Sequence, residues 1–428
     1  MKKIINIFVL MSVLLLGSCT EEYLNPSSAS QTQVVSDVTG LITLANGLSY
    51  KYSITRVSPN YTLPTTSGLL TRELVVLNAG NTDEQNLFQG GASVIGNNGV
   101  ITNLWNQSNL TKSNADLILN NLGIVTDQGT KGALQAHASI FKALALGNLA
   151  MFWQQAPIVT ASAAPFVDRI AVFNEAISIL EAARAELAKA PISAAFSSRI
   201  VAGIDYANTI NALIARYALM AGNNDKALAA ANLVSLATSV KSEFRHDDLT
   251  RNALFESSFG NKNVSEPFDR LFSLPLALQT PNTDGRIGFF YSAGGTLNLG
   301  RASFFTSNSS VLPVYRPGEV TLIKAEAFAR KNDLTNATVE LNKILQKVAA
   351  GDAYLIGANQ PAYAGANTQD AVLTEIYKQR CIELYLTGMR LEDSRRFNRP
   401  ASERTRNFLP YPFSERDNNP NTPADPAN

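Results

Sequence analysis

The most specific stretch of the sequence is Gln379-Arg380-Cys381-Ile382-Glu383-Leu384-Tyr385-Leu386-Thr387-Gly388-Met389-Arg390-Leu391-Glu392-Asp393-Ser394-Arg395-Arg396-Phe397. Its apolar residues follow helical spacing up to Gly388, and dense charge follows that glycine. Arg380 and Glu383 stand three positions apart, as do Arg390 and Asp393, so each pair is expected to meet across one helical turn. The stretch therefore predicts a helix, a break at Gly388 and a second, charged helix.

Upstream of this stretch, helical periodicity predicts three pairs of antiparallel helices, near residues 134–190, 205–236 and 318–348. Alanine is frequent in them, and small side chains let helices pack closely. Aligning Ala227 with Ala337 also superposes Ala215 on Ala325, so the second and third pairs are similar units. They resemble tetratricopeptide repeats, which also pack two helices per unit. The chain is therefore expected to be mainly α.

Two other segments have loop composition. Residues 78–103 are rich in Gly, Asn and Thr, and residues 282–310 are rich in Gly, Asn and Ser. Loops of this length are uncommon inside a compact protein and tend to be functional. No boundary favours a second domain, so residues 36–428 are expected to form one domain.

The first residues have the pattern of a secretory signal. Lys2 and Lys3 precede an apolar run over residues 7–16, which small residues end just before Cys19. The run has half of the roughly 20 residues that a membrane-spanning helix needs. Leu16-Gly17-Ser18-Cys19 resembles the lipobox of bacterial lipoproteins. We therefore expect a signal peptide over residues 1–18, lipidation of Cys19 and a flexible tether over residues 19–35, with acyl chains as the membrane anchor.

Charge and missing motifs exclude several functions. The 428 residues carry 36 Lys and Arg against 35 Asp and Glu, a net charge of +1 that gives no basis for nucleic-acid binding. The sequence has no phosphate-binding loop, no His-Glu-x-x-His, no paired Cys-x-x-Cys and no Gly-x-Ser-x-Gly. His137 is expected to be a packed core residue, His246 has no nucleophile nearby in sequence, and Cys381 is expected to be a buried, inert thiol. We predict no enzyme activity, no cofactor and no metal.

The pattern Arg-x-x-Glu-Leu-x-x-x-Gly-x-Arg-x-x-Asp, which begins at Arg380, resembles the C-terminal signature of the SusD/RagB family of outer-membrane nutrient-binding lipoproteins. The ending over residues 408–416 and the helix over residues 316–327 are similar to that family too, and Trp105 with residues 114–118 fits more loosely. Cys381-Ile382 and Ser394 depart from its usual pattern. The resemblance implies a right-handed superhelical scaffold of helix pairs, packed against a loop-rich half that binds ligand.

The resemblance also implies a function. Family members sit on the cell surface, cover a TonB-dependent outer-membrane transporter of the SusC type and deliver a glycan or peptide to it, without making or breaking a bond. The signature residues Arg380, Glu383, Arg390 and Asp393 are expected to serve the fold. Candidate ligand residues come from the two loop segments and their surroundings, and they are Asn81, Asp83, Trp105, Phe290, Tyr291 and Arg301.

Two other functions stay open at this point. The chain fits a lipid-anchored tetratricopeptide scaffold of the cell envelope that binds no nutrient. It also fits a surface hydrolase with paired carboxylates, although no spacing among the 35 acidic residues singles out a pair. The ligand itself, whether oligosaccharide, polysaccharide or peptide, is not specified by the sequence.

Overall fold

A computed structural model describes residues 31–260, 264–291 and 303–427. The signal peptide, Cys19 and Arg301 lie outside these residues, and residues 31–34 of the expected tether form a short helix. The helices are α2 (Gln31–Val34), α3 (Val38–Ser53), α4 (Pro59–Leu70), α5 (Thr82–Gln89), η2 (Gly91–Ser93), α6 (Gly99–Asn120), η3 (Leu122–Ile124), α7 (Gln128–Phe152), α8 (Arg169–Leu187), α9 (Ala194–Ser197), α10 (Tyr206–Met220), α11 (Asn224–Ala231), η4 (Phe255–Gly260), η5 (Leu276–Leu278), α12 (Gly285–Phe290), α13 (Pro317–Arg330), α14 (Leu334–Leu345), η6 (Ala349–Gly351), α15 (Gln369–Glu383), α16 (Arg390–Arg396), η7 (Ala401–Glu403) and α17 (Phe413–Asn418).

The described strands form short two-stranded ribbons. β1 (Leu74–Val76) pairs with β5 (Ser265–Pro267), β2 (Gln155–Pro157) with β3 (Phe166–Asp168), and β4 (Glu243–Phe244) with β6 (Leu312–Pro313), all antiparallel. In the β1–β5 and β4–β6 ribbons the two strands lie on either side of helices in the chain, whereas the loop over residues 158–165 joins β2 directly to β3. The fold is therefore mainly α, as the sequence predicts, and the ribbons fasten loops to the helical body.

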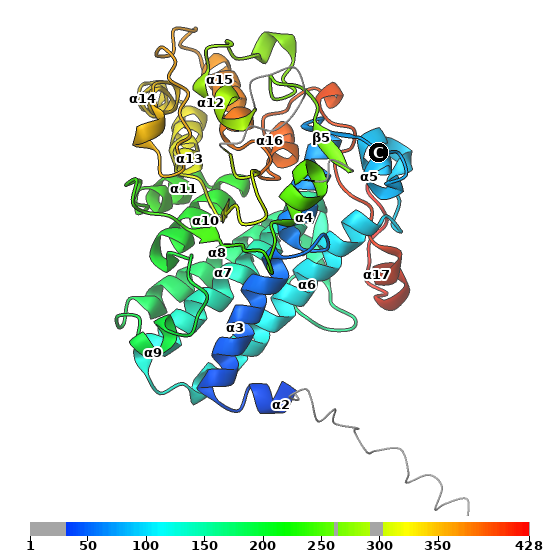
Figure 1. The fold of residues 1–428 in the computed structure, drawn as a ribbon, viewed down its shortest axis with the longest axis vertical. Helices are drawn as coiled ribbons and strands as arrows, with labels where there is room; N and C mark the ends of the chain where they lie inside the picture. Colours follow the sequence, from blue (N-terminus) through cyan, green and yellow to red (C-terminus); the bar gives the residue numbers. More distant parts are fainter. Residues whose placement is uncertain (1–30, 261–263, 292–302, 428) are drawn as a thin grey trace, which may run out of the picture.

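Three helix pairs lie side by side on one half of the molecule: α7 with α8, α10 with α11, and α13 with α14 (Figure 1). Aspartates cap four of these helices, because the side chains of Asp127, Asp168, Asp205 and Asp333 each accept a hydrogen bond from a backbone N–H of the first turn. The turn of the second pair contains Gly222 at φ 82°, and the turn of the third contains Asn332 at φ 61°. These two residues hold equivalent positions, and glycine and asparagine are the residues that tolerate left-handed φ best.

Close helix packing joins the pairs into one body. α10 packs against α8, α7 and α13, and α11 packs against α13. Gly147 of α7 faces the ring of Tyr217 in α10, and a Cβ at this glycine would overlap that ring. Leu213, Ile214 and Ala215 of α10 are buried in the main core. The helices therefore share one core, as neighbouring repeats do.

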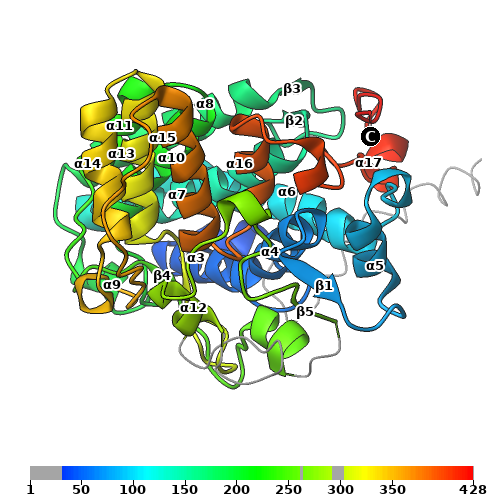
Figure 2. The ribbon, with the colours of Figure 1, turned by 90° about the horizontal axis from the view of Figure 1, so that it is seen from above.

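α4, α5 and the β1–β5 ribbon lie on the other side of the molecule, whereas α15 lies beside α13 and α14 (Figure 2). Both segments expected to be loops contain helices: α5 and the start of α6 lie within residues 78–103, and α12 lies within residues 282–310. Asn98 and Asp284 cap α6 and α12 through their side chains. Polar residues of the kind that form loops also begin helices, which is why composition alone was misleading here. α11 ends at Ala231, a few residues before the expected end of the second pair near residue 236.

Among the described residues, no helix combines the length and the apolar character that crossing a bilayer requires.

Candidate functional site

The charged residues of the C-terminal stretch form a buried network. Arg380 of α15 donates two hydrogen bonds to Asp393 of α16, from Nε to Oδ2 at 2.8 Å and from Nη2 to Oδ1 at 3.0 Å. Asp393 also accepts from Arg396 Nη2 at 2.7 Å. The predicted pairings of Arg380 with Glu383 and of Arg390 with Asp393 were therefore wrong, because the bonds run mainly between helices. Arg390 instead donates to the backbone carbonyls of residues 272 and 273.

Two glutamates extend this network to other helices. Glu326 of α13 accepts from Arg330 at 2.7 Å and from Arg396. Burial alone would raise the pKa of Glu326, but Arg396, Arg380 and Arg330 lower it to about 2. Glu383 accepts from Arg286 Nη1 at 3.3 Å and from Lys347. Both carboxylates are shielded from solvent and paired with basic side chains, so they hold helices together rather than contact a ligand.

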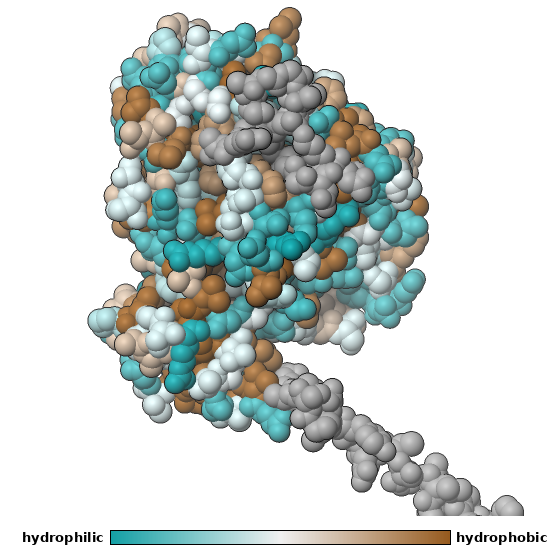
Figure 3. Space-filling model, viewed as in Figure 1, coloured by the Kyte–Doolittle hydropathy of each residue, from teal (hydrophilic) through white to brown (hydrophobic). Residues whose placement is uncertain are grey.

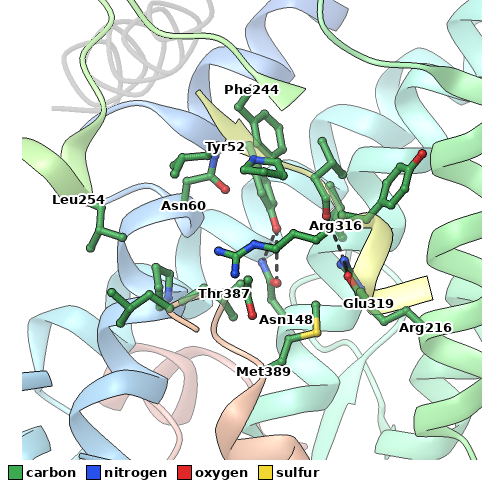
Figure 4. A pocket seen from close by; sticks show the side chains of 18 of the residues that line it. Tyr52, Asn60, Asn148, Arg216, Phe244, Leu254, Arg316, Glu319, Thr387 and Met389 are labelled. Carbon is green, nitrogen blue, oxygen red and sulfur yellow. Dashed lines mark hydrogen bonds and ion pairs between the residues drawn. The ribbon is translucent and has the colours of Figure 1, made fainter. Parts of the chain in front are cut away.

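An internal cavity of about 70 Å³ lies between α3, α4, α7, α13 and the turn before α16. Figure 4 shows Asn60, Arg316 and Thr387 around it. Part of its polar wall is paired: Asn148 Nδ2 donates to the Tyr52 hydroxyl at 3.1 Å, and Arg216 and Glu319 form an ion pair. Asn60 Nδ2 and Arg316 Nε have no hydrogen-bond partner among the described atoms. Small-molecule sites usually enclose about 300–1,000 Å³. The cavity is too small for a sugar ring, and a ligand site must be sought on the surface.

The loop-rich half presents an aromatic surface beside the β1–β5 ribbon. Phe268, at the end of β5, is 43% exposed, and its ring centroid lies 6.5 Å from that of Phe88 in α5. The guanidinium carbon of Arg72 lies 4.0 Å from the Phe88 centroid, and Leu77 is exposed next to the ribbon. We call these four residues, with residues 81–83 at the start of α5, the loop face.

Three hydrogen bonds fix the geometry of the loop face. The backbone N–H of Phe268 donates to the carbonyl of Glu73 at 3.1 Å, which extends the ribbon. Glu84 of α5 accepts from Arg56 at 2.8 Å and from the Tyr61 hydroxyl at 3.2 Å, which docks α5 on α4. A preorganised aromatic ring flanked by polar groups can stack on the apolar face of a sugar or on a peptide side chain.

Asn81 and Asp83 belong to the loop face, at the N-terminal end of α5. Asn81 precedes the helix and its side chain donates to the Asn78 carbonyl at 3.1 Å. The Asp83 carboxylate lies against Gly99, where a Cβ would come within 2.6 Å of Oδ2. Gly99 begins α6, so a negative charge is favourable at this place. The ligand role of these two residues stays a prediction, and Asp83 also has this structural role.

The three aromatic candidates are core residues. Trp105, Phe290 and Tyr291 are 1%, 0% and 2% exposed. Trp105 packs edge-on against Trp153 at 4.9 Å, and its Nε1 donates to Glu415 at 3.1 Å. Phe290 and Tyr291 pack against Tyr385 of the signature stretch. This burial corrects the sequence-based expectation, since a ligand at the surface has no access to the faces of these rings.

The exposed ring of Phe268 was missed from the sequence. It follows Pro267 and precedes Asp269 and Arg270, an aromatic residue among polar neighbours. That context is a weak signal of exposure. Only the pairing of β5 with β1 places it beside Phe88.

The remaining reactive side chains are packed as expected. His137 is fully buried, its Nε2 donates to the Ala45 carbonyl at 2.8 Å, and burial lowers its pKa to about 4. Burial raises the pKa of the Cys381 thiol to about 12, so that the reactive thiolate is scarce. In the part of the chain that the structure describes, no three His, Cys, Asp or Glu side chains converge as metal ligands would.

Comparisons with known proteins agree with this architecture. Residues 302–425 match the SusD family. A SusD superfamily protein from Bacteroides vulgatus has a TM-score of 0.70 at 16% identity, covering 91% of this chain and 98% of that one. A SusD superfamily protein from Bacteroides fragilis scores 0.68 at 15% identity, with 91% and 99% covered. A putative sugar binding protein from Bacteroides vulgatus scores 0.67 at 14%, with 91% and 98% covered. No curated protein matches the chain.

Proposed function

The chain has the SusD fold and carries the C-terminal region of the SusD family, and from that premise we propose that it is a nutrient-binding lipoprotein of the bacterial cell surface. It binds a glycan or a peptide and delivers it to a TonB-dependent transporter of the outer membrane. The lipobox-like sequence before Cys19 supports a lipid anchor. The protein binds the nutrient and passes it to the transporter, and it catalyses no chemical step.

The observation that carries this proposal is the loop face. Its exposed Phe268 ring is held in place by a backbone hydrogen bond and supported by Phe88 and Arg72. Aromatic rings of this kind recognise the apolar faces of sugars, while neighbouring amide and carboxylate groups hydrogen-bond to hydroxyls. Among the similar structures, one is called a putative sugar binding protein and another a SusD-like carbohydrate binding protein, and both share only the fold with this chain.

Ligand binding is tested on the full-length protein in detergent. The probes are maltohexaose, cellohexaose, xylohexaose and tetra-alanine, measured by isothermal titration calorimetry. We expect Phe268→Ala to weaken binding of the preferred probe by at least about tenfold, because stacking is lost. Phe413→Ala is the matched control, since Phe413 is equally exposed but belongs to α17. Equal effects of the two substitutions would overturn the role of the loop face.

The transporter partner is tested separately. Tagged, full-length protein is captured from detergent-solubilised outer membranes, and the retained proteins are identified by mass spectrometry. Recovery of a TonB-dependent barrel in comparable amount is the expected result. Capture of soluble envelope proteins alone, together with protection from protease on whole cells, would favour the envelope scaffold instead.

A further inference from the structure

A second surface groove lies on the helical half, between α3 and the segment that continues from β4 to Thr250, and residues 201–204 close one side of it. Figure 2 shows β4 beside α3, and Figure 3 shows apolar residues gathered over α3 and α9 on the lower part of the face that it draws. The volume of this groove is about 410 Å³. That value lies within the range of about 300–1,000 Å³ typical of small-molecule sites. We call it the α3–β4 groove.

One side of the α3–β4 groove is apolar and accessible. Tyr50 of α3 is 47% exposed and Val201 is 51% exposed, and both line the groove. Gly47 lies one helical turn before Tyr50, and a Cβ there would meet no atom within 4 Å, so the space over the helix is open. An exposed tyrosine ring above an open stretch of helix gives a flat ligand room to stack.

The opposite side carries the charged residues Glu243, Arg245 and Asp247. Glu243 and Arg245 are two positions apart along the strand direction of β4, so their side chains leave the backbone on the same face. The Arg245 Nε lies 3.6 Å from Glu243 Oε1, too far for a hydrogen bond. Among the described residues, neither side chain has a closer polar partner. The pair therefore offers guanidinium donors and carboxylate acceptors side by side.

His246 forms part of the same wall and is more than nine-tenths buried. Its Nδ1 lies 3.1 Å from the Thr250 carbonyl, and a carbonyl only accepts, so Nδ1 carries the hydrogen. Burial lowers the pKa of His246, which leaves Nε2 as a neutral acceptor. That nitrogen has no hydrogen-bond partner among the described atoms. Nε2 itself is closed to solvent, so His246 shapes this wall and offers no hydrogen bond to a ligand in the groove.

These features select the ligand chemistry. Asp247 also lines the groove, but its Oδ1 already accepts hydrogen bonds from the backbone N–H groups of Leu249 and Thr250. The Glu243–Arg245 pair offers a carboxylate beside a guanidinium, so an ion of either sign would meet one group of like charge. A purely apolar ligand would remove water from the charged pair without replacing its hydrogen bonds. A neutral ring with adjacent hydroxyls satisfies both sides at once: its apolar face covers Tyr50, and neighbouring hydroxyls donate to Glu243 and accept from Arg245.

We infer that the α3–β4 groove is a second saccharide site, separate from the loop face. This inference rests on the proposed function and deepens it, because two sites on one molecule would hold one polymer at two points. Two linked sites gain affinity through effective concentration when the chain of sugars spans them.

The test uses the full-length protein in detergent and titrates maltohexaose, cellohexaose and xylohexaose by calorimetry. We expect two sites for the preferred hexasaccharide, of which Phe268→Ala removes one. Tyr50→Ala and Glu243→Gln should each weaken the other site at least about tenfold. Glu243→Gln keeps the shape of the side chain, and thermal melting confirms that each variant is folded.

A substitution that fills the groove tests the site without removing any side chain that would contact the ligand. Gly47→Phe places a ring into the open space of the groove and should abolish the second site. Gly123→Phe is the matched control, because a Cβ at Gly123 also meets no atom within 4 Å but lies outside the groove. The contrary result is that calorimetry finds a single binding site whose affinity is the same in Tyr50→Ala, Glu243→Gln and Gly47→Phe as in the wild type. That result would overturn the inference and leave the proposed function standing.

Two further outcomes separate the hypotheses. Binding of tetra-alanine in the groove, sensitive to Tyr50→Ala, would overturn the saccharide assignment. If none of the three hexasaccharides binds the wild-type protein at millimolar concentration, the second saccharide site is refuted, and capture of the transporter then decides the proposed function independently.

Discussion

Arg380 and Asp393 form a two-pronged ion pair between α15 and α16, with N–O distances of 2.8 and 3.0 Å, although 13 positions separate them in the chain. Both side chains are almost fully buried. The planar guanidinium matches a carboxylate in this geometry, so the pair fixes the angle between the two helices. The signature stretch therefore acts as a clamp that holds α15 and α16 at a fixed angle. Glu326 of α13 joins this clamp to the third helix pair through its ion pair with Arg396.

The first prediction concerns this clamp. Asp393→Ala leaves Arg380 and Arg396 buried without that carboxylate, and breaking a buried pair in this way typically costs about 3–5 kcal/mol. We expect a large drop in the midpoint of urea unfolding. Lys189→Ala is the control, because it removes an exposed ion pair with Glu186 and should cost less than about 1 kcal/mol. Similar midpoints for the two variants would contradict the clamp.

The second prediction concerns Glu73. Its burial raises its pKa to about 7, an effect that nearby Arg390 opposes only in part. Between pH 4.5 and 7 the native state therefore holds this proton more tightly than the unfolded state does. The contribution of Glu73 to the free energy of unfolding consequently falls as the pH rises through this window, by roughly 3 kcal/mol, and is constant above it.

Glu73→Gln removes that titration. The free energy of unfolding of the variant, relative to that of the wild type, is expected to be higher at pH 8 than at pH 4.5. Urea unfolding at both pH values measures this difference. The backbone contacts of residue 73, including its carbonyl bond to the Tyr385 hydroxyl, are unchanged by the substitution. A stability difference that does not change with pH would refute the raised pKa.

The third prediction compares two helical glycines. Gly147→Ala forces a methyl group into the ring of Tyr217 and should destabilise the protein by about 1–3 kcal/mol, because α7 and α10 must move apart. Gly47→Ala lies within α3 with no atom within 4 Å of its Cβ, and should stabilise by up to about 1 kcal/mol. Thermal melting distinguishes the two. A stabilising Gly147→Ala would mean that the contact between α7 and Tyr217 is looser than described.

The fourth prediction concerns Cys381. Its thiol is 3% exposed and its pKa is raised to about 12, so iodoacetamide at pH 8 should label it slowly in the native protein and rapidly in urea. The Cys19→Ser variant isolates this thiol, and Cys19→Ser with Cys381→Ser is the blank. Labelling of the native protein at the rate of an exposed thiol would show that α15 opens readily.

Local patterns predicted much of the helical half. The three helix pairs follow from the spacing of apolar residues, and their ends follow from capping aspartates and from Gly222 and Asn332 in the turns. These signals lie within a few residues of the structure they specify, so a single sequence reveals them. The loop-rich half was harder, because the asparagines and glycines of residues 78–103 serve both as loop residues and at the start of helices.

The candidate site shows the limit of sequence reasoning more sharply. Trp105 and Tyr291 are large aromatics next to polar segments, and both lie in the core, whereas Phe268 has a similar context and is exposed. Sequence neighbours do not determine exposure when the covering elements come from distant parts of the chain. Tyr385 covers Tyr291, and it lies almost a hundred positions further on.

By itself the sequence determined the helical class, the pairing of adjacent helices and the dense charge of the C-terminal stretch, since each depends on spacing along a few turns. Only the tertiary structure decided which charges meet and which aromatic rings face solvent. Arg380 contacts Asp393 rather than Glu383 because α16 folds back along α15 after the turn at Gly388, whose φ is 85°. Partners and exposure are set by such long-range packing, and local spacing carries no information about it.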